Sequence, residues 1–250
     1  MPKHHADYLQ VYERDFYQRA DGITHWQAGE MRTGDALAAV GYAVGVSSFE
    51  ELRSLVPFEG EGRGYVGKSA LEQLACLPVR RQPKSVLDVG GGRGEVAWAL
   101  SQLGARVQLV EPHPLAADWL QRTASQFKAP LGDVKLINEL VPECLDSLEL
   151  NSVDTVLFVE SIEHIPDHCF EPFWEKVKPA LVANSGRLIV TNWLSYFPLD
   201  VSGPEHCRLV DSQLYARLAE GGRVVFQQGA HLVVDYWPIT VTYGTGRPAD

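Results

Sequence analysis

The chain has 250 residues, 45% of them hydrophobic and 22% charged, which is the composition of a folded globular protein and excludes a disordered or fibrous one. Its 22 basic and 32 acidic residues give a net charge of −10, which argues against a nucleic-acid partner because phosphate contacts need clustered Lys and Arg. The length suits one large domain, or a catalytic domain with a small appendage.

No hydrophobic segment of the signal-peptide type opens the sequence, and no apolar run reaches the roughly 18 residues that predict a membrane span. The four cysteines are scattered and form no Cys-x-x-Cys pair. Reduced thiols of this kind are typical of cytoplasmic proteins. We therefore expect a cytoplasmic protein without a membrane partner.

The first part of the chain, residues 1–82, shows the apolar periodicity and the start signals of helices. Thr33 or Asp35 could cap a helix through the stretch DALAAVGYAV. Ser48 precedes Glu51 at the spacing of a capping box, which indicates another helix start. We expect this part to be a mostly helical extension.

From residue 83 to residue 250, short apolar runs alternate with helical stretches. Strand and helix in alternation predict an α/β fold, in which a parallel sheet carries helices on both faces. The apolar runs are nearly continuous, as expected for strands that are buried on both faces. The expected strands are residues 85–90, 106–111, 134–138, 153–159 and 187–192.

The C-terminal region departs from this alternation. Two further apolar runs, RVVFQQ and HLVVDYW, are separated by only two residues and predict an antiparallel hairpin at the edge of the sheet. A short helix should precede the hairpin, with Asp211 as its N-cap and Gly221 as its stop.

A glycine-rich loop follows the first expected strand, in the sequence VLDVGGGRGE. Glycines permit a tight turn and let a ligand contact the backbone, and the helix that follows offers free N–H groups. A dinucleotide site would have a third glycine where Glu95 stands, and the charge of Glu95 would repel a pyrophosphate. A zwitterionic or cationic ligand fits better. The residues expected to bind it are Asp88, Gly90, Gly91, Gly92 and Gly94.

This loop resembles motif I of the class I S-adenosylmethionine (SAM) methyltransferases, and the order of elements from about residue 84 to residue 240 is similar to their seven-stranded sheet. The resemblance implies a Rossmann-like, doubly wound sheet that is mostly parallel, with an antiparallel C-terminal hairpin. It also implies SAM as the cofactor. Residues 83–250 would then be the SAM-binding catalytic domain, and residues 1–82 a helical cap that contributes to substrate binding.

The ends of the second and third strands supply further candidates for the cofactor pocket. Glu111 stands where open α/β sheets place the acidic residue that binds the ribose hydroxyls, and the resemblance puts Pro112 near the adenine edge. Where family members often have an Asp, this chain has Asn138 and Glu139, and either could accept a hydrogen bond from the adenine amino group. Leu140 could pack on the ring.

The fourth strand ends in Phe158 and Val159, which we expect along the methionine part of the cofactor because ligands bind outside the carboxyl ends of the strands. His164 and Glu160 follow this strand and are the candidate catalytic residues. A histidine ordinarily titrates near neutral pH, so His164 could act as a general base if the acceptor must lose a proton. Equally, it could be a structural histidine that packs the loop.

A metal site is the sharper alternative for the same segment. Glu160, Glu163 and His164 could lie on one face of a helical turn, and carboxylate and imidazole ligands suit Mg, Mn or Zn. The pattern is similar to metal-dependent members of the family, such as small-RNA 2′-O-methyltransferases and some quinone-pathway O-methyltransferases. His168 or His206 would have to supply a fourth ligand. Our expectation is that no metal is bound.

Substrate residues should come from outside the common core. In the cap, Tyr65 and Lys68 lie in the stretch GRGYVGK, where a cation or an aromatic ring could face the cofactor. After the fifth strand, Asn192, Trp193 and Tyr196 could form a wall for a planar or apolar acceptor. Both groups could instead be ordinary loop or core residues.

The resemblance implies an enzyme that transfers a methyl group from SAM to an oxygen or nitrogen of a small-molecule acceptor. No Asn/Asp-Pro-Pro-Phe/Tyr motif follows the fourth strand, which argues against the amino methyltransferases of nucleic acid and protein. Other chemistry with SAM is the alternative: aminocarboxypropyl transfer, or cyclisation of SAM that releases methylthioadenosine. A SAM-binding subunit without catalysis is a third hypothesis. The oligomeric state is not predicted.

Overall fold

The structure is a computed structural model of the chain, and it describes residues 34–45, 51, 54, 82–126, 129–192, 207–229 and 231–237. Of the expected N-terminal extension it describes helix α2, Gly34–Val44, and helical positions at residues 51 and 54. Asp35 lies within α2 rather than before it, whereas Thr33 and Ser48 fall outside the described residues. No helix in the described ranges is long and apolar enough to cross a membrane.

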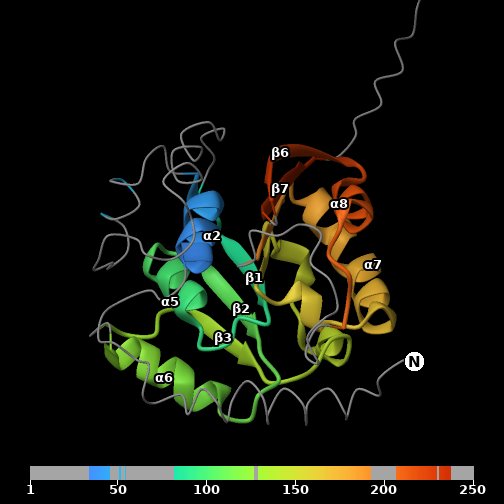
Figure 1. Cartoon of the computed structure of the whole chain (residues 1–250). Coiled ribbons are helices and arrows are strands. Elements are labelled where there is room, and N and C mark those ends of the chain that lie inside the picture. Colours follow the sequence, from blue (N-terminus) through green and yellow to red (C-terminus); the bar gives the residue numbers. More distant parts are fainter. Residues whose placement is uncertain are drawn as a thin grey trace, which may run out of the picture.

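Seven strands of the described chain form one sheet in the order β3-β2-β1-β4-β5-β7-β6 (Figure 1). The pairs from β3 to β5 are parallel, whereas β7 pairs antiparallel with both β5 and β6. This confirms the expected mostly parallel sheet with its antiparallel C-terminal hairpin. The strands are β1 Ser85–Val89, β2 Arg106–Val110, β3 Val134–Ile137, β4 Thr155–Val159, β5 Arg187–Thr191, β6 Gly222–Gln228 and β7 His231–Tyr236.

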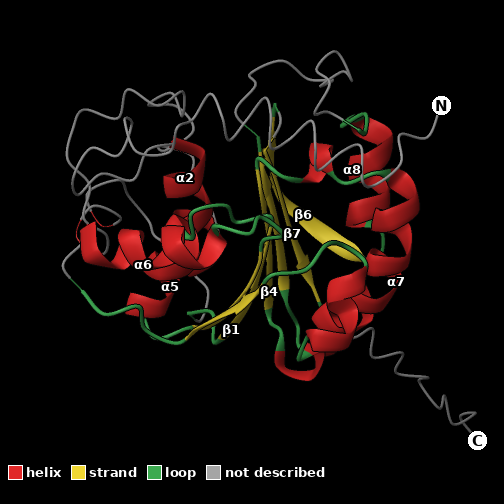
Figure 2. Cartoon of the chain, turned by 90° about the horizontal axis from the view of Figure 1, so that it is seen from below, coloured by secondary structure: helices red, strands yellow, loops and turns green. Residues whose placement is uncertain are grey.

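Helices cover both faces of the sheet, as the alternation of strand and helix predicts. In Figure 2, α2, α5 and α6 lie on one side of the sheet, and α7 and α8 lie on the other. Short 3₁₀ helices join the strands near their ends. The remaining elements are α5 Glu95–Gln102, α6 Ala116–Gln126, α7 Asp167–Ala183, α8 Ser212–Ala219, η2 Glu143–Ser147, η3 Leu150–Ser152 and η4 Ile162–His164.

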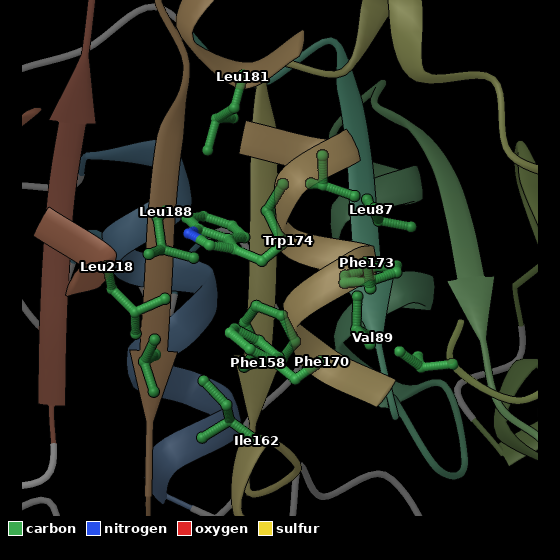
Figure 3. Packing of buried hydrophobic residues seen from close by; sticks show 14 of the residues in the cluster. Leu87, Val89, Phe158, Ile162, Phe170, Phe173, Trp174, Leu181, Leu188 and Leu218 are labelled. Atoms are coloured by element: carbon green, nitrogen blue, oxygen red, sulfur yellow. The ribbon is translucent and has the colours of Figure 1, made fainter. Parts of the chain in front are cut away.

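The hydrophobic core is divided by the sheet into two clusters. Successive side chains of a strand point to opposite faces, so Val86 belongs to the cluster under α2 and α5, and Leu87 to the cluster under α7 and α8. Figure 3 shows the second cluster, in which rings from β4 and α7 meet. Every residue of β1 and of β5 is buried, which confirms that these nearly continuous apolar runs are covered on both faces.

The N-cap of α8 and the glycine that ends this helix form as predicted. Asp211 is the N-cap of α8, and its Oδ1 accepts hydrogen bonds from the backbone N–H groups of Gln213 and Leu214, both at 2.9 Å. Gly221 follows this helix with a φ of 75°, in the left-handed region that glycine tolerates best. The two strands of the hairpin follow directly.

Helix α2 is fastened to the sheet by a buried ion pair. Arg187 of β5 is fully buried, and its Nε and Nη2 lie 2.6 and 2.9 Å from the carboxylate oxygens of Asp235 on β7. Its Nη1 donates to the backbone oxygen of Tyr42 in α2 at 2.7 Å. The Tyr42 hydroxyl in turn lies 3.2 Å from Nδ1 of His231. Helix α2 therefore shares a core with the sheet, while the domain division at residues 82 and 83 stays a prediction.

Candidate active site

A cavity lies where the carboxyl ends of β1, β2, β3 and β4 meet, the place where open α/β sheets bind their ligands. Six residues that the sequence nominates contribute to its wall, together with apolar residues of the loops after β3 and β4. The lining residues are Val89, Gly90, Val110, Glu111, Pro112, Glu139, Leu140, Val141, Ser161, His164, Ile165 and Pro166.

The glycine loop closes one end of this cavity. Gly90 has a φ of 70° and its N–H donates to the oxygen of Val110 at 2.7 Å, which ties the loop to β2. A Cβ at Gly90 would lie 2.6 Å from Cβ of Ser161, so only glycine lets the loops after β1 and β4 approach this closely. Gly94 has a φ of 74° and directly precedes α5.

The carboxyl group of Asp88 lies beneath the loop. Asp88 is fully buried, and neither of its oxygens has a hydrogen-bond partner among the described residues. A Cβ at Gly91 would lie 2.6 Å from Oδ2 of Asp88, so the carboxyl sits directly against the loop. Burial and the nearby charge of Glu111 raise the pKa of Asp88 from 3.8 to about 7. A buried carboxyl without a partner suits a site that receives a cationic ligand.

Glu111 orders the loop from the end of β2. Its Oε2 accepts a hydrogen bond from the N–H of Gly92 at 2.9 Å, and its Oε1 accepts one from the N–H of His113 at 3.0 Å. The side chain is buried and also lines the cavity. Each carboxylate oxygen can accept more than one hydrogen bond, so Glu111 can bind a ligand hydroxyl while it holds the loop.

The two alternatives after β3 have different surroundings. Nδ2 of Asn138 donates to the backbone oxygens of Glu111 and His113 at 2.7 and 2.8 Å, which uses both of its hydrogens. Glu139 lines the cavity, and its carboxylate accepts a hydrogen bond from the hydroxyl of Ser147. Of the two residues, Glu139 is the one in the cavity wall, and Leu140 lies beside it.

The last two residues of β4 do not lie where the sequence predicts them. Phe158 is fully buried, and its ring centroid lies 5.8 Å from that of Phe170 and 6.4 Å from that of Phe173, in the core under α7 (Figure 3). Val159 is partly buried and packs against the opposite cluster. Neither residue is part of the cavity wall described above. An apolar run that is buried on both faces does not show which of its last residues reaches a ligand.

The loop after β4 brings His164 into the cavity wall. Ser161 anchors this loop, since its hydroxyl donates to the backbone oxygen of Val89 at 2.6 Å and its own backbone oxygen accepts from the N–H of His164 at 3.1 Å. His164 is buried and lines the cavity. Glu160 has a φ of 50°, in the left-handed region, which is uncommon for a residue other than glycine and is often found at functional sites.

The three residues of the alternative metal site do not lie on one face of an α-helical turn. The turn is a 3₁₀ helix, Ile162–His164, so Glu160 lies outside it, and the spacing of an α-helical turn does not apply. Glu163 is buried, and Oε1 of its carboxylate is 3.9 Å from Nε2 of His164. Among the described residues, no group of three or more Asp, Glu, His or Cys side chains is arranged to hold a metal ion.

The predicted substrate residues fall mostly outside the described ranges, which holds for Tyr65, Lys68, Trp193 and Tyr196. His206, an alternative metal ligand, lies outside them as well. Asn192 is described, and the structure buries it against the carboxylate of Glu163. Its side chain therefore supports the loop after β4 and does not line the cavity described above.

Sequence reasoning missed several residues of the cavity wall. Ser161, Val141, Ile165 and Pro166 line it without belonging to any expected set. Ser161 has the clearest signal, because it is the second residue after the predicted fourth strand and its Cβ is what excludes a side chain at Gly90. Apolar residues such as Val141 carry no signal that separates them from ordinary core residues.

Comparisons with known proteins agree with this geometry. A family model described as "Methyltransferase domain" matches residues 63–238, which is most of the chain. The curated "Ubiquinone biosynthesis O-methyltransferase" of Cupriavidus pinatubonensis (strain JMP 134 / LMG 1197) is 26% identical over an alignment of 183 residues, with 67% of this chain and 70% of that protein covered.

Solved structures show weaker similarity. The Burkholderia thailandensis 1,6-didemethyltoxoflavin-N1-methyltransferase, solved with 1,6-didemethyltoxoflavin and S-adenosylhomocysteine bound, is 17% identical with a TM-score of 0.49, over 95% of this chain and 91% of that one. An O-methyltransferase family protein from Burkholderia thailandensis is 14% identical with a TM-score of 0.46, over 61% of this chain and 50% of that one. Because the family model covers well over half of the sequence, this chain belongs to the methyltransferase-domain family and is a SAM-dependent transferase.

Proposed function

We propose that this methyltransferase transfers the methyl group to a hydroxyl oxygen of a small-molecule acceptor, with an amine nitrogen as the alternative. The observation that carries the proposal is the place of His164, whose buried imidazole lies in the wall of the same cavity as the glycine loop. A hydroxyl that attacks carbon must lose a proton, and an imidazole at this place can take it. The curated O-methyltransferase relative supports oxygen as the acceptor atom.

The residues of the cavity fit SAM. The carboxylate of Glu111 in the cavity wall and the buried carboxyl of Asp88 beneath the glycine loop suit a ligand with a sulfonium and an ammonium group. Glu111 would bind the ribose hydroxyls, Glu139 the adenine amino group, and Leu140 the face of the ring. When bound, SAM supplies an electrophilic methyl group on a positively charged sulfur.

The chain's own residues then position the acceptor and move its proton. Gly90 and Ser161 set the distance between the loops after β1 and β4, because a Cβ at Gly90 would lie only 2.6 Å from Cβ of Ser161. Ile165 and Pro166 give the wall beside His164 an apolar surface that excludes water. His164 would accept the proton of the acceptor on its unprotonated ring nitrogen. Orientation of the nucleophile is a large part of the rate enhancement in such a displacement.

Charge supports a small acceptor over a polyanion. The chain carries a net charge of −10, and Glu111 and Glu139 add two carboxylates to the cavity wall. A nucleic-acid acceptor would have to overcome this repulsion, since its phosphates need basic side chains. Tyr65, Lys68, Trp193 and Tyr196 remain the candidates for contacts with the acceptor.

The test is a product analysis by mass spectrometry. The purified chain is incubated with SAM alone and with a panel of catechols, simple phenols and aromatic amines. We expect S-adenosylhomocysteine and a methylated product to form only when a phenolic acceptor is present. Methylthioadenosine formed without an acceptor would overturn the proposal in favour of cyclisation. Methylation of the amines alone would move the acceptor atom from oxygen to nitrogen.

A further inference from the structure

Glu163 is the point at which both ends of one connection meet. The chain leaves the described sheet at Asn192, directly after β5, and the described part resumes at Cys207, shortly before α8. The backbone oxygen of Glu163 accepts hydrogen bonds from the N–H groups of Cys207 at 2.8 Å and Arg208 at 3.2 Å. The backbone of Glu163, in the loop after β4, therefore binds the residues at which the described chain resumes.

The side chain of Glu163 binds Asn192, at the other end of the same connection. With the amide of Asn192 oriented to place its nitrogen toward the carboxylate, Nδ2 lies 2.6 Å from Oε1 and 3.1 Å from Oε2 of Glu163. This orientation is the one that pairs a donor with acceptors, since the opposite one would put oxygen against oxygen. Backbone and side chain of Glu163 thus bind the two ends separately.

Burial makes the contact strong. Glu163 is 4% exposed and Asn192 is 3% exposed, so neither group can exchange its partner for bulk water. An ionised carboxylate that is buried without hydrogen bonds has a large desolvation cost, so the amide of Asn192 stabilises Glu163 in this position. Burial and the charge of Glu163 both raise the pKa of Tyr215 in α8, which places this charge near that helix too.

The next residue along the chain is His164 in the cavity wall. Glu163 and His164 belong to the same 3₁₀ turn, so a change in the anchoring of Glu163 moves the backbone that carries the imidazole. We infer that Glu163 is a positioning residue that joins the loops after β4 and β5 and so sets the acceptor side of the cavity. The inference rests on the proposed function for its catalytic consequence, but its structural part does not.

The cofactor side should be independent of this contact. Asp88 lies on β1, Glu111 directly after β2 and Glu139 in the loop after β3. The hydrogen bonds of Glu111 with Gly92 and His113, and of Glu139 with Ser147, do not involve Glu163 or Asn192. Loss of the contact should therefore raise the acceptor KM and lower kcat while the affinity for S-adenosylhomocysteine stays the same. A general loss of stability would not produce this split.

The experiment is a double-mutant cycle of Glu163→Gln and Asn192→Leu, with Asn184→Leu as the matched control. Asn184 also donates with its amide, to the backbone oxygens of Asn151, Val153 and Ala180, but at the amino ends of the strands. Three readouts are compared: hydrogen exchange of the peptide 207–214, calorimetric binding of S-adenosylhomocysteine, and kinetics with whichever phenol of the panel is methylated.

In Asn192→Leu we expect exchange of peptide 207–214 about tenfold faster, because the turn that holds it has lost an anchor. The acceptor KM should rise about tenfold, the affinity for S-adenosylhomocysteine should change less than about twofold, and Glu163→Gln should add little to the effect of Asn192→Leu. Asn184→Leu should lower thermal stability alone. Unchanged exchange in both Glu163→Gln and Asn192→Leu, or fully additive effects of the two substitutions, would overturn the inference. If no acceptor is methylated, the proposed function fails, while exchange and additivity in unfolding still decide the role of Glu163.

Discussion

The two sides of the cavity are built from different kinds of contact. On the cofactor side, carboxylate and amide side chains hold the backbone of neighbouring loops, as Glu111 holds Gly92 and His113. On the acceptor side, side chains from loops far apart in the sequence hold one another, as Glu163 and Asn192 do. Substitutions on the first side should therefore change cofactor binding, and substitutions on the second side should change catalysis.

The difference also explains why the cofactor side of the cavity can be recognised in the sequence and the acceptor side cannot. A loop that offers its backbone to a ligand needs glycines at fixed places, and that spacing is visible in VLDVGGGRGE. A pair such as Glu163 and Asn192 forms no recognisable sequence motif, because Glu and Asn each occur in many other structural roles. The cofactor side can be tested first, since its residues are the better defined.

The largest effect should come from Asp88→Asn in the absence of cofactor. A carboxyl with a pKa raised from 3.8 to about 7 favours the folded state fully below about pH 4, and this contribution is lost as the pH rises through about 7. At pH 8 the ionised, buried Asp88 thus costs roughly 4 kcal/mol of stability, which asparagine avoids. We expect the variant to be more stable than the parent at pH 8 and to bind SAM more weakly.

Urea unfolding at pH 5 and pH 8 checks this prediction, and calorimetry measures SAM binding. The pH 5 measurement is the control, since the folded state then holds Asp88 largely protonated and the gain from asparagine should be smaller than at pH 8. A stability difference that does not change between the two pH values would show that Asp88 has an ordinary pKa. Tight SAM binding by the variant would remove Asp88 from the cofactor site.

The second-largest effect is expected for Gly90→Ala. The new Cβ would lie 2.6 Å from Cβ of Ser161 and would push apart the loops after β1 and β4. We expect the affinity for S-adenosylhomocysteine to fall about 100-fold, because the loop can no longer take its turn and a backbone donor is displaced. Calorimetric titration measures the loss.

Gly104→Ala is the control for this substitution. Gly104 also has a positive φ, of 88°, but a Cβ there would meet no atom within 4 Å. Its cost should be only the backbone strain of about 1 kcal/mol, seen as a lower melting temperature with unchanged cofactor affinity. Equal losses of affinity in the two variants would mean that backbone strain, and not the approach of Ser161, explains the need for glycine in the loop.

Much of the fold could be predicted from the sequence, because it depends on local patterns. The strands, the hairpin and the cap by Asp211 follow from apolar runs and turn residues. The attachment of α2 could not be predicted, since it depends on Arg187 and Asp235, which are far apart in the chain and meet only in the folded sheet. The 3₁₀ turn after β4, which rules out the α-helical spacing of the alternative metal site, could not be predicted for a related reason: the turn is held by contacts with Val89 and Cys207, which are distant in the chain.

On the acceptor side, His164→Gln should lower kcat by about 30-fold to 100-fold, the usual contribution of a general base. Glutamine has a similar size and can still form hydrogen bonds, but it cannot take up a proton. The affinity for S-adenosylhomocysteine should remain within about twofold of the parent, in contrast with Gly90→Ala. Unchanged kcat with the most reactive phenol of the panel would make His164 a structural residue of the loop.

The smallest effect, none at all, is expected from removal of metal ions. The carboxylate of Glu163 is engaged by Asn192, and Glu160 lies outside the 3₁₀ turn that carries His164, so the three residues are not disposed as ligands. Methyl transfer in excess EDTA should therefore match that of the untreated enzyme, measured with the same phenol. A loss in EDTA that Mg, Mn or Zn restores would show that this turn rearranges around a metal, with His168 or His206 as a further ligand. The acceptor side would then be organised by an ion, and the contact between Glu163 and Asn192 would belong only to the metal-free state.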